Sequence, residues 1–333
     1  MIGQMLEIPF GSLEGSSAVK LSQEAQNSDK MQIVRPESCV CEKKVVPLRS
    51  QSNIKNMSFK NTRLVPFRYP GGKFYALNLI EPYVLACPHD EYREPFFGGG
   101  SVFFNKNKAR YNLLNDIDGE LMTTYRVMQD PKLREKLISL VSAEIATKER
   151  WREIFDFIPR NDLEIAFKYF YLNRTSFSGK LVSPAWGYRD KRSLPPKRWH
   201  EKITPCGQML EGVDLLNKDF EEIIQCPSKG NNVLMFIDPP YYKPPKKKHY
   251  RNGFNLCDHV RLANCLRKTP YNFILTYEDA QEVRDLYSWA YINDIEFAYR
   301  VDNSAINNGQ RHKGAELIIT NYKISKPVQL NLL

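Results

Sequence analysis

The 333-residue sequence lacks the features of secreted and membrane proteins. No stretch approaches the roughly 18 consecutive apolar residues that a membrane-spanning helix requires. The amino-terminal stretch MIGQMLEIPFGSLEG has no basic segment followed by an apolar core, which is the pattern of a secretory signal. We therefore expect a cytoplasmic protein that does not contact a membrane.

Cysteine is scarce, and the seven residues present are scattered along the chain. An odd, scattered set predicts reduced thiols rather than a disulfide framework. Cys39 and Cys41 are too close together for the usual zinc-binding pair, and no second pair follows them. The pattern GxxxxGK[ST] is also absent, which argues against a P-loop. We expect neither a bound metal nor P-loop chemistry.

Acidic residues are outnumbered, since 48 Lys and Arg face 38 Asp and Glu, giving a formal net charge of +10. An excess of cations favours polyanionic partners such as nucleic acid. Hydrophobic residues make up 42% of the chain, enough to build a substantial core. The composition thus predicts a globular protein with an anionic partner.

Short apolar runs alternate with amphipathic segments after residue 56, whereas residues 1–56 are polar and aperiodic. The polar part predicts a disordered tail. The alternation is typical of an α/β fold with a doubly wound, mostly parallel sheet and helices on both faces. A polar basic loop joins the last two runs, which predicts an antiparallel hairpin. The seven expected strands lie within residues 93–97, 111–116, 213–220, 232–240, 272–279, 294–301 and 315–323.

A long insertion, residues 119–205, separates the second and third expected strands. Its first half has helical patterns. Its second half is rich in Gly, Pro, aromatic and basic residues and predicts loops or a short hairpin. We interpret the insertion as a separate lobe, so that residues 57–118 and 206–333 form the domain that carries the sheet.

Polar or glycine residues follow four of the expected strands, where ligands of open α/β sheets bind. Gly98 and Gly100 follow the first strand, and glycine there lets a cofactor approach the backbone. Asp116 ends the second strand, where an acid can receive ribose hydroxyls, although a helix cap would explain it equally well. Asp219 and Phe220 follow the third strand and offer an acceptor and a flat ring.

The fourth strand ends in the sequence DPPYY, residues 238–242. An enzyme that methylates an exocyclic amino group must hold its N–H groups with two acceptors, because the lone pair is delocalised into the ring. Asp238 offers a carboxylate, and the rigid backbone of Pro239 can present its carbonyl at a fixed angle. Tyr241 offers a face on which a flipped base can stack. The basic stretch that follows can contact neighbouring phosphates.

The ordered motifs RYPGGK, EPFFGGGSVF, NDID, NKDF and DPPYY resemble those of the DNA adenine methylase (Dam) family. This is the alpha group of S-adenosylmethionine-dependent DNA N6-adenine methyltransferases, the D12 class. The segment YFYLNRTSFSGK resembles the family's LNR helix and following loop. The resemblance extends from about Leu64 to Tyr322 and leaves the amino-terminal tail outside.

The resemblance implies a Rossmann-like methyltransferase sheet, with the insertion as a mainly helical target-recognition domain. It implies S-adenosyl-L-methionine as cofactor and a flipped-out adenine in double-stranded DNA as substrate. The catalytic residues would be Asp238, Pro239, Pro240 and Tyr241. The cofactor-binding residues would be Tyr69, Lys73, Phe97, Gly98, Gly100, Asp116, Asp219, Phe220 and Asp238.

Nucleic-acid contacts are expected from basic residues of the insertion and of two later loops. They are Arg174, Arg189, Lys191, Arg192, Lys197, Arg198, Lys246, Lys247, Lys248, Arg251, Arg311 and Lys313. The segment KLVSPAWGYRDKRSLPPKRW does not reproduce the hairpin by which GATC-specific members read their site, so no recognition sequence is assigned. Trp186 and Trp199 are expected to pack rather than to intercalate. In biological terms we expect a monomer or weak dimer at the nucleoid of a prokaryote or phage-infected host, with a cognate restriction endonuclease as a further partner to test.

Two other functions stay open on the sequence. One keeps the pocket but methylates N4 of cytosine in DNA or an amino group in RNA; the Asp at the start of DPPYY favours adenine. The other is a nucleic-acid-binding protein whose cofactor site is inactive. Intact residues at all the motif positions argue against the second alternative.

Overall fold

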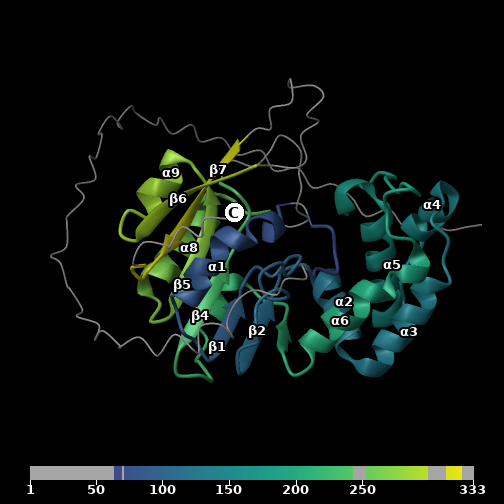
Figure 1. Cartoon of the computed structure of the whole chain (residues 1–333), viewed down its shortest axis with the longest axis horizontal. Coiled ribbons are helices and arrows are strands. Elements are labelled where there is room, and N and C mark those ends of the chain that lie inside the picture. Colours follow the sequence, from purple (N-terminus) through teal and green to yellow (C-terminus); the bar gives the residue numbers. More distant parts are fainter. Residues whose placement is uncertain (1–63, 70, 243–252, 299–312, 325–333) are drawn as a thin grey trace, which may run out of the picture. The chain divides into compact units, whose positions relative to one another are not determined.

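A seven-stranded sheet forms the centre of the computed structural model, which describes residues 64–69, 71–242, 253–298 and 313–324 (Figure 1). The strand order is β3-β2-β1-β4-β5-β7-β6. The first five strands run parallel, and β7 pairs antiparallel with both β5 and β6. The predicted doubly wound, mostly parallel sheet and its terminal hairpin are therefore confirmed. The strands are β1 (Glu91–Glu94), β2 (Tyr111–Asn115), β3 (Asp214–Leu216), β4 (Val233–Ile237), β5 (Asn272–Glu278), β6 (Tyr291–Ala298) and β7 (Lys313–Thr320).

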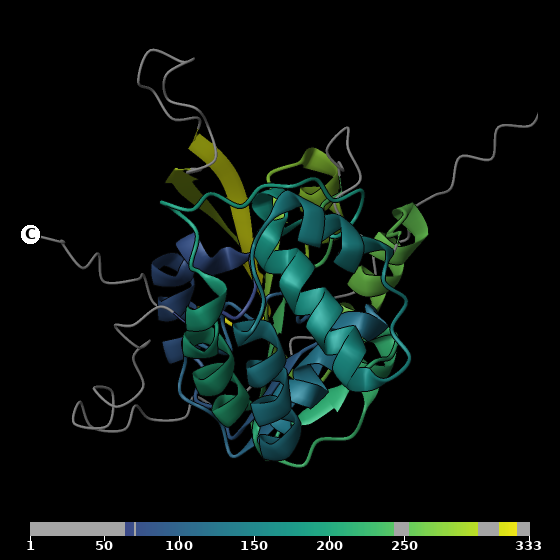
Figure 2. The same ribbon diagram turned by 90° about the vertical axis from the view of Figure 1, so that its right-hand side faces the viewer.

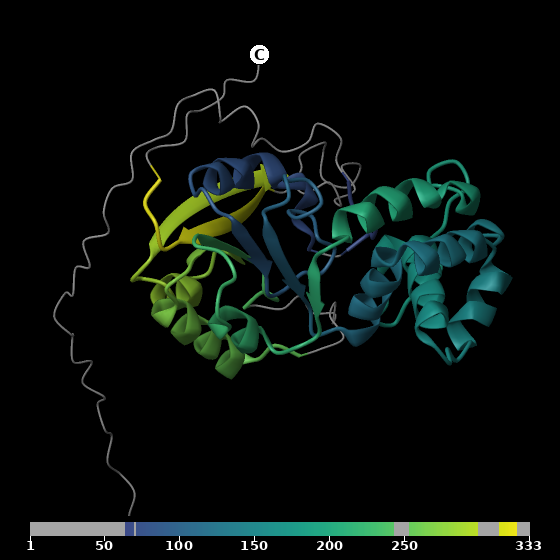
Figure 3. The ribbon, with the colours of Figure 1, turned by 90° about the horizontal axis from the view of Figure 1, so that it is seen from below.

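Strand β4 is buried along its whole length because helices cover both faces of the sheet (Figure 3). Leu234 and Phe236 pack into the cluster that includes α1 (Leu77–Leu85). Met235 and Ile237 point the other way, into the cluster that contains side chains of α7 (Phe220–Gln225), α8 (Leu256–Lys268) and α9 (Gln281–Leu286). A strand that is buried on both faces reads as an uninterrupted apolar run, which is why this one was visible in the sequence.

The order of the strands reverses between β1 and β4, which are hydrogen-bonded neighbours although far apart in the chain. Chain crossovers leave the sheet in opposite directions from this point. A crevice therefore opens outside the carboxyl ends of these two strands, where open α/β sheets bind their ligands.

Five helices connect β2 to β3 and form what we call the helical segment, residues 119–210 (Figure 2). Four of them begin where a side chain accepts a hydrogen bond from a backbone N–H of the first turn; the four capping residues are Asp118, Asp130, Thr147 and Asn161. The helices are α2 (Gly119–Gln129), α3 (Pro131–Ser142), α4 (Lys148–Asp156), α5 (Asp162–Thr175) and α6 (His200–Leu210).

The helical segment begins and ends at neighbouring strands, because β2 and β3 pair in parallel. The Gln129 side-chain amide also donates to the carbonyl oxygens of Leu210 and Val213, at 2.7 and 2.8 Å. The two ends of the segment are thus fastened to each other. The predicted boundary at Pro205 lies inside α6, which continues to Leu210.

The second half of the insertion is mostly loop, as its composition predicted. It contains two short 3-10 helices, η3 (Phe177–Gly179) and η4 (Pro196–Arg198), and one antiparallel bridge between Ser176 and Trp186. Trp199 is fully buried and donates its indole N–H to the carbonyl of Leu194, which confirms a packing role. No helix of the described residues is long and apolar enough to cross a membrane.

Candidate active site

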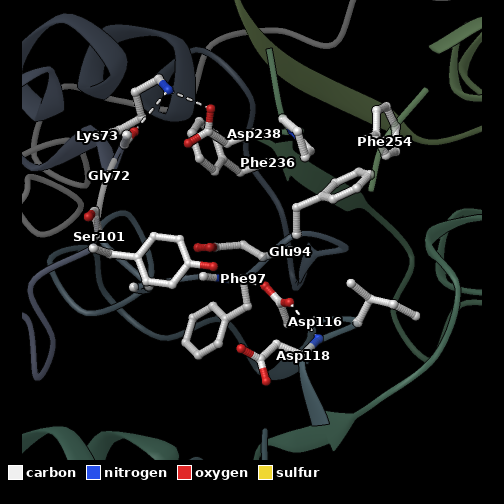
Figure 4. Close-up of a pocket in the computed structure, with 18 of the residues that line it drawn as sticks. Gly72, Lys73, Glu94, Phe97, Ser101, Asp116, Asp118, Phe236, Asp238 and Phe254 are labelled. Carbon is white, nitrogen blue, oxygen red and sulfur yellow. Dashed lines mark hydrogen bonds and ion pairs between the residues drawn. The ribbon is translucent and has the colours of Figure 1, made fainter. Parts of the chain in front are cut away.

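A cleft opens at the carboxyl ends of β1 and β4, where the strand order reverses (Figure 4). The Lys73–Asp238 pair lies at one end of the cleft, Asp116 and Asp118 lie at the other, and Glu94 lies between them. The sequence-predicted residues that line the cleft are Tyr69, Lys73, Phe97, Gly98, Gly100, Asp116, Asp238 and Pro240. Residues as far apart in the chain as Tyr69 and Pro240 thus meet in one cavity.

The glycine-rich turn after β1 leaves space that side chains would fill. Gly98 and Gly100 have positive φ angles of +46° and +65°, which L residues rarely adopt. A Cβ atom on Gly98 would lie 2.9 Å from the ring of Tyr69. The backbone of Gly98 is fixed on both sides, because its N–H donates to Asp116 Oδ2 and its carbonyl accepts from the Tyr125 hydroxyl, each at 2.8 Å. The turn is therefore rigid and open toward the cleft.

Asp116 is nearly buried at the end of β2 and faces the cleft. Its Oδ2 accepts from Gly98 N, and its Oδ1 accepts from Asp118 N at 2.9 Å. Burial raises the pKa of Asp116 to about 6, against the effect of the backbone N–H groups that lower it. The cap of the following helix is Asp118, so Asp116 is not the capping residue. An ionised carboxylate has about four acceptor positions, so two remain for hydroxyl groups in the cleft.

Asp238 follows β4 and is held by two donors. Lys73 Nζ lies 2.5 Å from Asp238 Oδ1, and the hydroxyl of Thr276 on β5 donates to the same oxygen at 2.8 Å. Lys73 belongs to a short 3-10 helix, η2 (Lys73–Tyr75), and its side chain is 3% exposed. A buried ion pair is stable when further hydrogen bonds fix its geometry, and Thr276 supplies one here.

Tyr241 lies close to the same ion pair. Its hydroxyl donates to Glu316 Oε1, and the Lys73 ammonium lies 3.5 Å from that hydroxyl and 5.2 Å from the ring centroid. Glu316 is on β7 and is 2% exposed. Asp238, Lys73, Tyr241 and Glu316 therefore form one polar cluster, although they come from widely separated parts of the chain.

Glu94 is a buried carboxyl group that lines the cleft between the two ends described above. Its Oε1 accepts from the Tyr92 hydroxyl at 2.7 Å and from Phe103 N at 2.9 Å. Burial raises the pKa of Glu94 to about 8, while these hydrogen bonds and the charge of Lys106 lower it less strongly. The cleft thus contains a carboxyl group that titrates near neutral pH.

Asp219 and Phe220 do not line this cleft. Asp219 caps α7 by accepting from Glu221 N, and the Arg261 guanidinium donates to both of its carboxylate oxygens at 2.6 and 2.9 Å. Phe220 stacks on Phe96 at a centroid distance of 5.3 Å and also packs on Phe254. Since Phe96 and Phe254 line the cleft, Phe220 supports its wall from behind.

Two arginines, Arg68 and Arg174, lie close enough to repel each other, and neither has a carboxylate partner among the described residues. Arg68 precedes Tyr69, which lines the cleft. Arg174 is 8% exposed in the last turn of α5, and its Nε has no hydrogen-bond partner in the described part of the chain. Burial and, to a smaller extent, the charge of Arg68 lower the pKa of Arg174 to about 10. The Tyr188 hydroxyl has the opposite effect and raises the pKa of both Arg174 and Arg68. Asn173 brings Arg68 to this place by bonding its backbone N–H and carbonyl, at 2.9 and 2.8 Å.

The other basic residues predicted to bind nucleic acid lie on the surface or outside the described residues. Arg198 is exposed and forms an ion pair with Glu201 within its own turn. Lys246, Lys247, Lys248, Arg251 and Arg311 lie outside the described residues, and Lys313 is described only as the first residue of β7. The remaining four, Arg189, Lys191, Arg192 and Lys197, are exposed in the second half of the insertion.

Four residues of this region escaped the sequence analysis: Arg68, Glu94, Thr276 and Glu316. Arg68 and Glu94 are the first residues of the quoted motifs RYPGGK and EPFFGGGSVF, so a charged residue at the start of a motif was the available signal. Thr276 lies within an apolar strand, and nothing in the sequence around it indicates a functional role. Glu316 did give a signal, because it is a single charge at the start of the apolar run ELIIT.

Comparison with known proteins agrees with this architecture. Residues 69–301 match the family model of the D12 class N6 adenine-specific DNA methyltransferases. Similar proteins include the type II methyltransferase M.CviBI of Paramecium bursaria Chlorella virus NC1A, 25% identical over 77% of this chain and 98% of the relative. The type II methyltransferase M1.LlaDCHI of Lactococcus lactis subsp. cremoris is 25% identical over 80% of this chain and 99% of the relative. The DNA adenine methylase of Salmonella typhi is 24% identical over 75% and 92%.

The matched region contains the glycine-rich turn, Asp116 and the DPPYY segment, and it spans well over half of the chain. A family match of this extent supports the predicted adenine substrate over cytosine, RNA or a purely binding role. The chain belongs to the family of D12 class N6 adenine-specific DNA methyltransferases.

Proposed function

We propose that this methyltransferase uses S-adenosyl-L-methionine as methyl donor and acts on an adenine that is turned out of double-stranded DNA. The observation that carries the proposal is the Asp238–Lys73 pair, which lies at the end of a cleft whose other end presents Asp116. The cleft thus has an acceptor for an amino group and a separate acceptor for hydroxyl groups.

The residues of the cleft fit this cofactor. The turn at Gly98 and Gly100 leaves room that a Cβ atom would fill, and Asp116 retains acceptor positions for two ribose hydroxyls. Lys73 would bind the carboxylate of the methionine part, with Tyr69 and Phe97 as apolar walls. When bound, the cofactor supplies an electrophilic methyl group on a sulfonium sulfur. Adenine contacts from Asp219 and Phe220 stay a prediction, with Asp219 reachable only if its pair with Arg261 rearranges.

The transfer end of the cleft would position the target amino group. The two N–H groups of the target amine would donate hydrogen bonds to Asp238 and to the carbonyl of Pro239. This geometry draws the nitrogen lone pair out of conjugation with the ring. Tyr241 would stack on the extruded base, a contact worth about 1–3 kcal/mol. Pro240 lines the cleft and would restrict the backbone between these groups. The protein's contribution is positioning and electrostatics, and the proton that leaves the amino group passes toward Asp238 or solvent.

DNA binding would use the two arginines beside the cleft. A buried guanidinium without an anion is costly, and a DNA phosphate would supply the missing charge to Arg174 and Arg68. The exposed cations between Arg189 and Arg198 would add contacts that do not depend on sequence. A cognate restriction endonuclease and a monomeric or weakly dimeric state stay predictions.

The test is methyl transfer from labelled S-adenosyl-L-methionine to unmethylated duplex DNA, followed by nucleoside analysis and mapping of the modified bases. We expect N6-methyladenine in one short sequence context. Label in N4-methylcytosine, or transfer to RNA but not to DNA, would contradict the proposal. The Asp238→Ala variant serves as the control for contaminating methylases.

A further inference from the structure

Glu316 lies buried beside the Lys73–Asp238 pair at the transfer end of the cleft, although no motif at the strand ends includes it. It is at the carboxyl-end side of the sheet because β7 runs antiparallel to β5, with Glu316 opposite Glu278 and Ile318 opposite Thr276. Residues two apart on a strand share a face, so Glu316 lies on the same face as Thr276, which donates to Asp238. The antiparallel strand thus brings an acidic residue to the ends of the parallel strands.

Burial of Glu316 lowers the stability of the fold when its carboxylate is charged. Glu316 is 2% exposed, and the next three residues of β7, Leu317, Ile318 and Ile319, are fully buried and apolar. A carboxylate in such surroundings destabilises the fold unless donors and a positive charge compensate it. A β-branched apolar residue would fill the same space with a smaller loss of folding stability. The presence of a carboxylate therefore indicates a functional role.

Two contacts of Glu316 connect it to the proposed transfer site. Its Oε1 accepts from the Tyr241 hydroxyl, and its Oε2 lies 3.9 Å from Lys73 Nζ. The same ammonium lies 2.5 Å from Asp238 Oδ1. Lys73 is therefore shared between two carboxylates, one of which also holds the tip of the Tyr241 ring.

We propose that Glu316 is a positioning residue for methyl transfer: it fixes the ring of Tyr241 and shares Lys73 with Asp238. The inference rests on the proposed roles of Asp238 and Tyr241. A stacking surface that is fixed before the base arrives costs less conformational entropy when the base binds. A second carboxylate beside Lys73 also weakens the hold of that lysine on Asp238, which leaves Asp238 a better acceptor for the target amino group.

Three variants separate the two contacts. Glu316→Gln keeps an acceptor for the Tyr241 hydroxyl but removes the charge beside Lys73. Tyr241→Phe keeps the ring but removes the hydroxyl. Glu316→Ala removes both contacts. The matched control is Glu296→Gln, which removes one negative charge from an exposed position on the neighbouring strand β6.

The measurements are the single-turnover rate of methyl transfer on the duplex found in the mapping experiment and the Kd of S-adenosyl-L-methionine by calorimetry. We expect Glu316→Ala to lower the rate by about tenfold to a hundredfold, the range for a small displacement of reacting groups. The Kd should change by less than about threefold, because the proposed cofactor contacts of the glycine turn and Asp116 are intact. Adding Tyr241→Phe to Glu316→Ala should lower the transfer rate little further, since both changes remove the same hydrogen bond.

Two outcomes overturn the inference. One is a rate for Glu316→Gln and Glu316→Ala within twofold of the unchanged protein. The other is a loss of rate that parallels a loss of cofactor affinity or of folded protein, which marks a structural role. The Asp238→Ala variant shows which proposal has failed. Substantial turnover by Asp238→Ala refutes the proposed function itself. An inactive Asp238→Ala together with a fully active Glu316→Ala refutes only the role of Glu316.

Discussion

Lys73 Nζ lies 2.5 Å from Asp238 Oδ1, so the carboxylate that we assign to the target amino group is already bound to a cation. The base can reach Asp238 only if it replaces or joins this donor. Binding of a cofactor carboxylate to Lys73 would loosen the pair. The proposed cofactor and base sites would thus be linked through one ammonium group.

Removing the carboxylate tests that link. We expect Asp238→Ala to lower methyl transfer by at least about a hundredfold, because one acceptor for the target amine is lost from a preorganised site. Cofactor affinity should persist, since Lys73 then loses its 2.5 Å partner and can bind the methionine carboxylate. Calorimetry with S-adenosyl-L-methionine and a single-turnover assay measure the two effects separately. Retention of substantial turnover would refute the assigned role.

The glycine turn offers a prediction about stability. Gly100→Ala would place a Cβ atom 2.6 Å from Phe104 and 2.7 Å from Phe97, at a φ angle of +65°. Strain and overpacking together should lower the free energy of unfolding by about 2–4 kcal/mol. Gly212→Ala is the matched control, because Gly212 has a similar φ of +71° and nothing within 4 Å of the added atom. Urea unfolding measures the free energy of unfolding of both variants. An equal decrease in the two variants would contradict the packing argument.

The buried carboxyl of Glu94 predicts a pH dependence of stability. Its pKa is raised from 4.5 to about 8 in the folded protein, so the folded state binds the proton more tightly than the unfolded state does. The stability it confers is full below about pH 4.5 and is lost as the pH rises through about 8. Glu94→Gln should therefore lose less stability between pH 5 and pH 8.5 than the unchanged protein, as measured by urea midpoints. Glu135→Gln, at an exposed position of α3, should leave the slope unchanged.

Arg174 predicts opposite effects on binding and on stability. Arg174→Met should weaken DNA binding and reduce the slope of log Kd against log salt by about one, the effect of one lost phosphate contact. The same change should keep or raise the unfolding temperature, because it removes a buried cation whose Nε has no partner in the described residues. Arg152→Met, on the exposed face of α4, controls for loss of charge. A salt slope that is the same in both variants would exclude the phosphate contact.

The sheet and most of the cleft were predictable because they depend on local patterns. Strand β4 is buried on both faces and reads as an apolar run, and the rule that ligands bind at carboxyl ends of parallel strands then points to Gly98, Asp116 and Asp238. Glu316 was not predictable in this way, since its place depends on the register of an antiparallel strand. Arg68 is held near Arg174 by Asn173, which bonds to the backbone of Arg68 across 105 positions. Such contacts depend on tertiary packing, which no short pattern encodes.

The fastening of the helical segment by Gln129 has a consequence for how specificity can change. Because Gln129 joins the ends of the segment at Leu210 and Val213, beside paired strands, the chain between these points leaves and rejoins the sheet at one edge. Helix α2 is the part that must be retained, since Tyr125 holds the glycine turn through Gly98. Residues 130–210 therefore form a unit for exchange, in which Asn173 is also retained for its two hydrogen bonds to the backbone of Arg68. If the segment is the target-recognition part that the sequence predicts, transplanting the equivalent stretch from a relative with a known site gives a hybrid enzyme with a new target sequence.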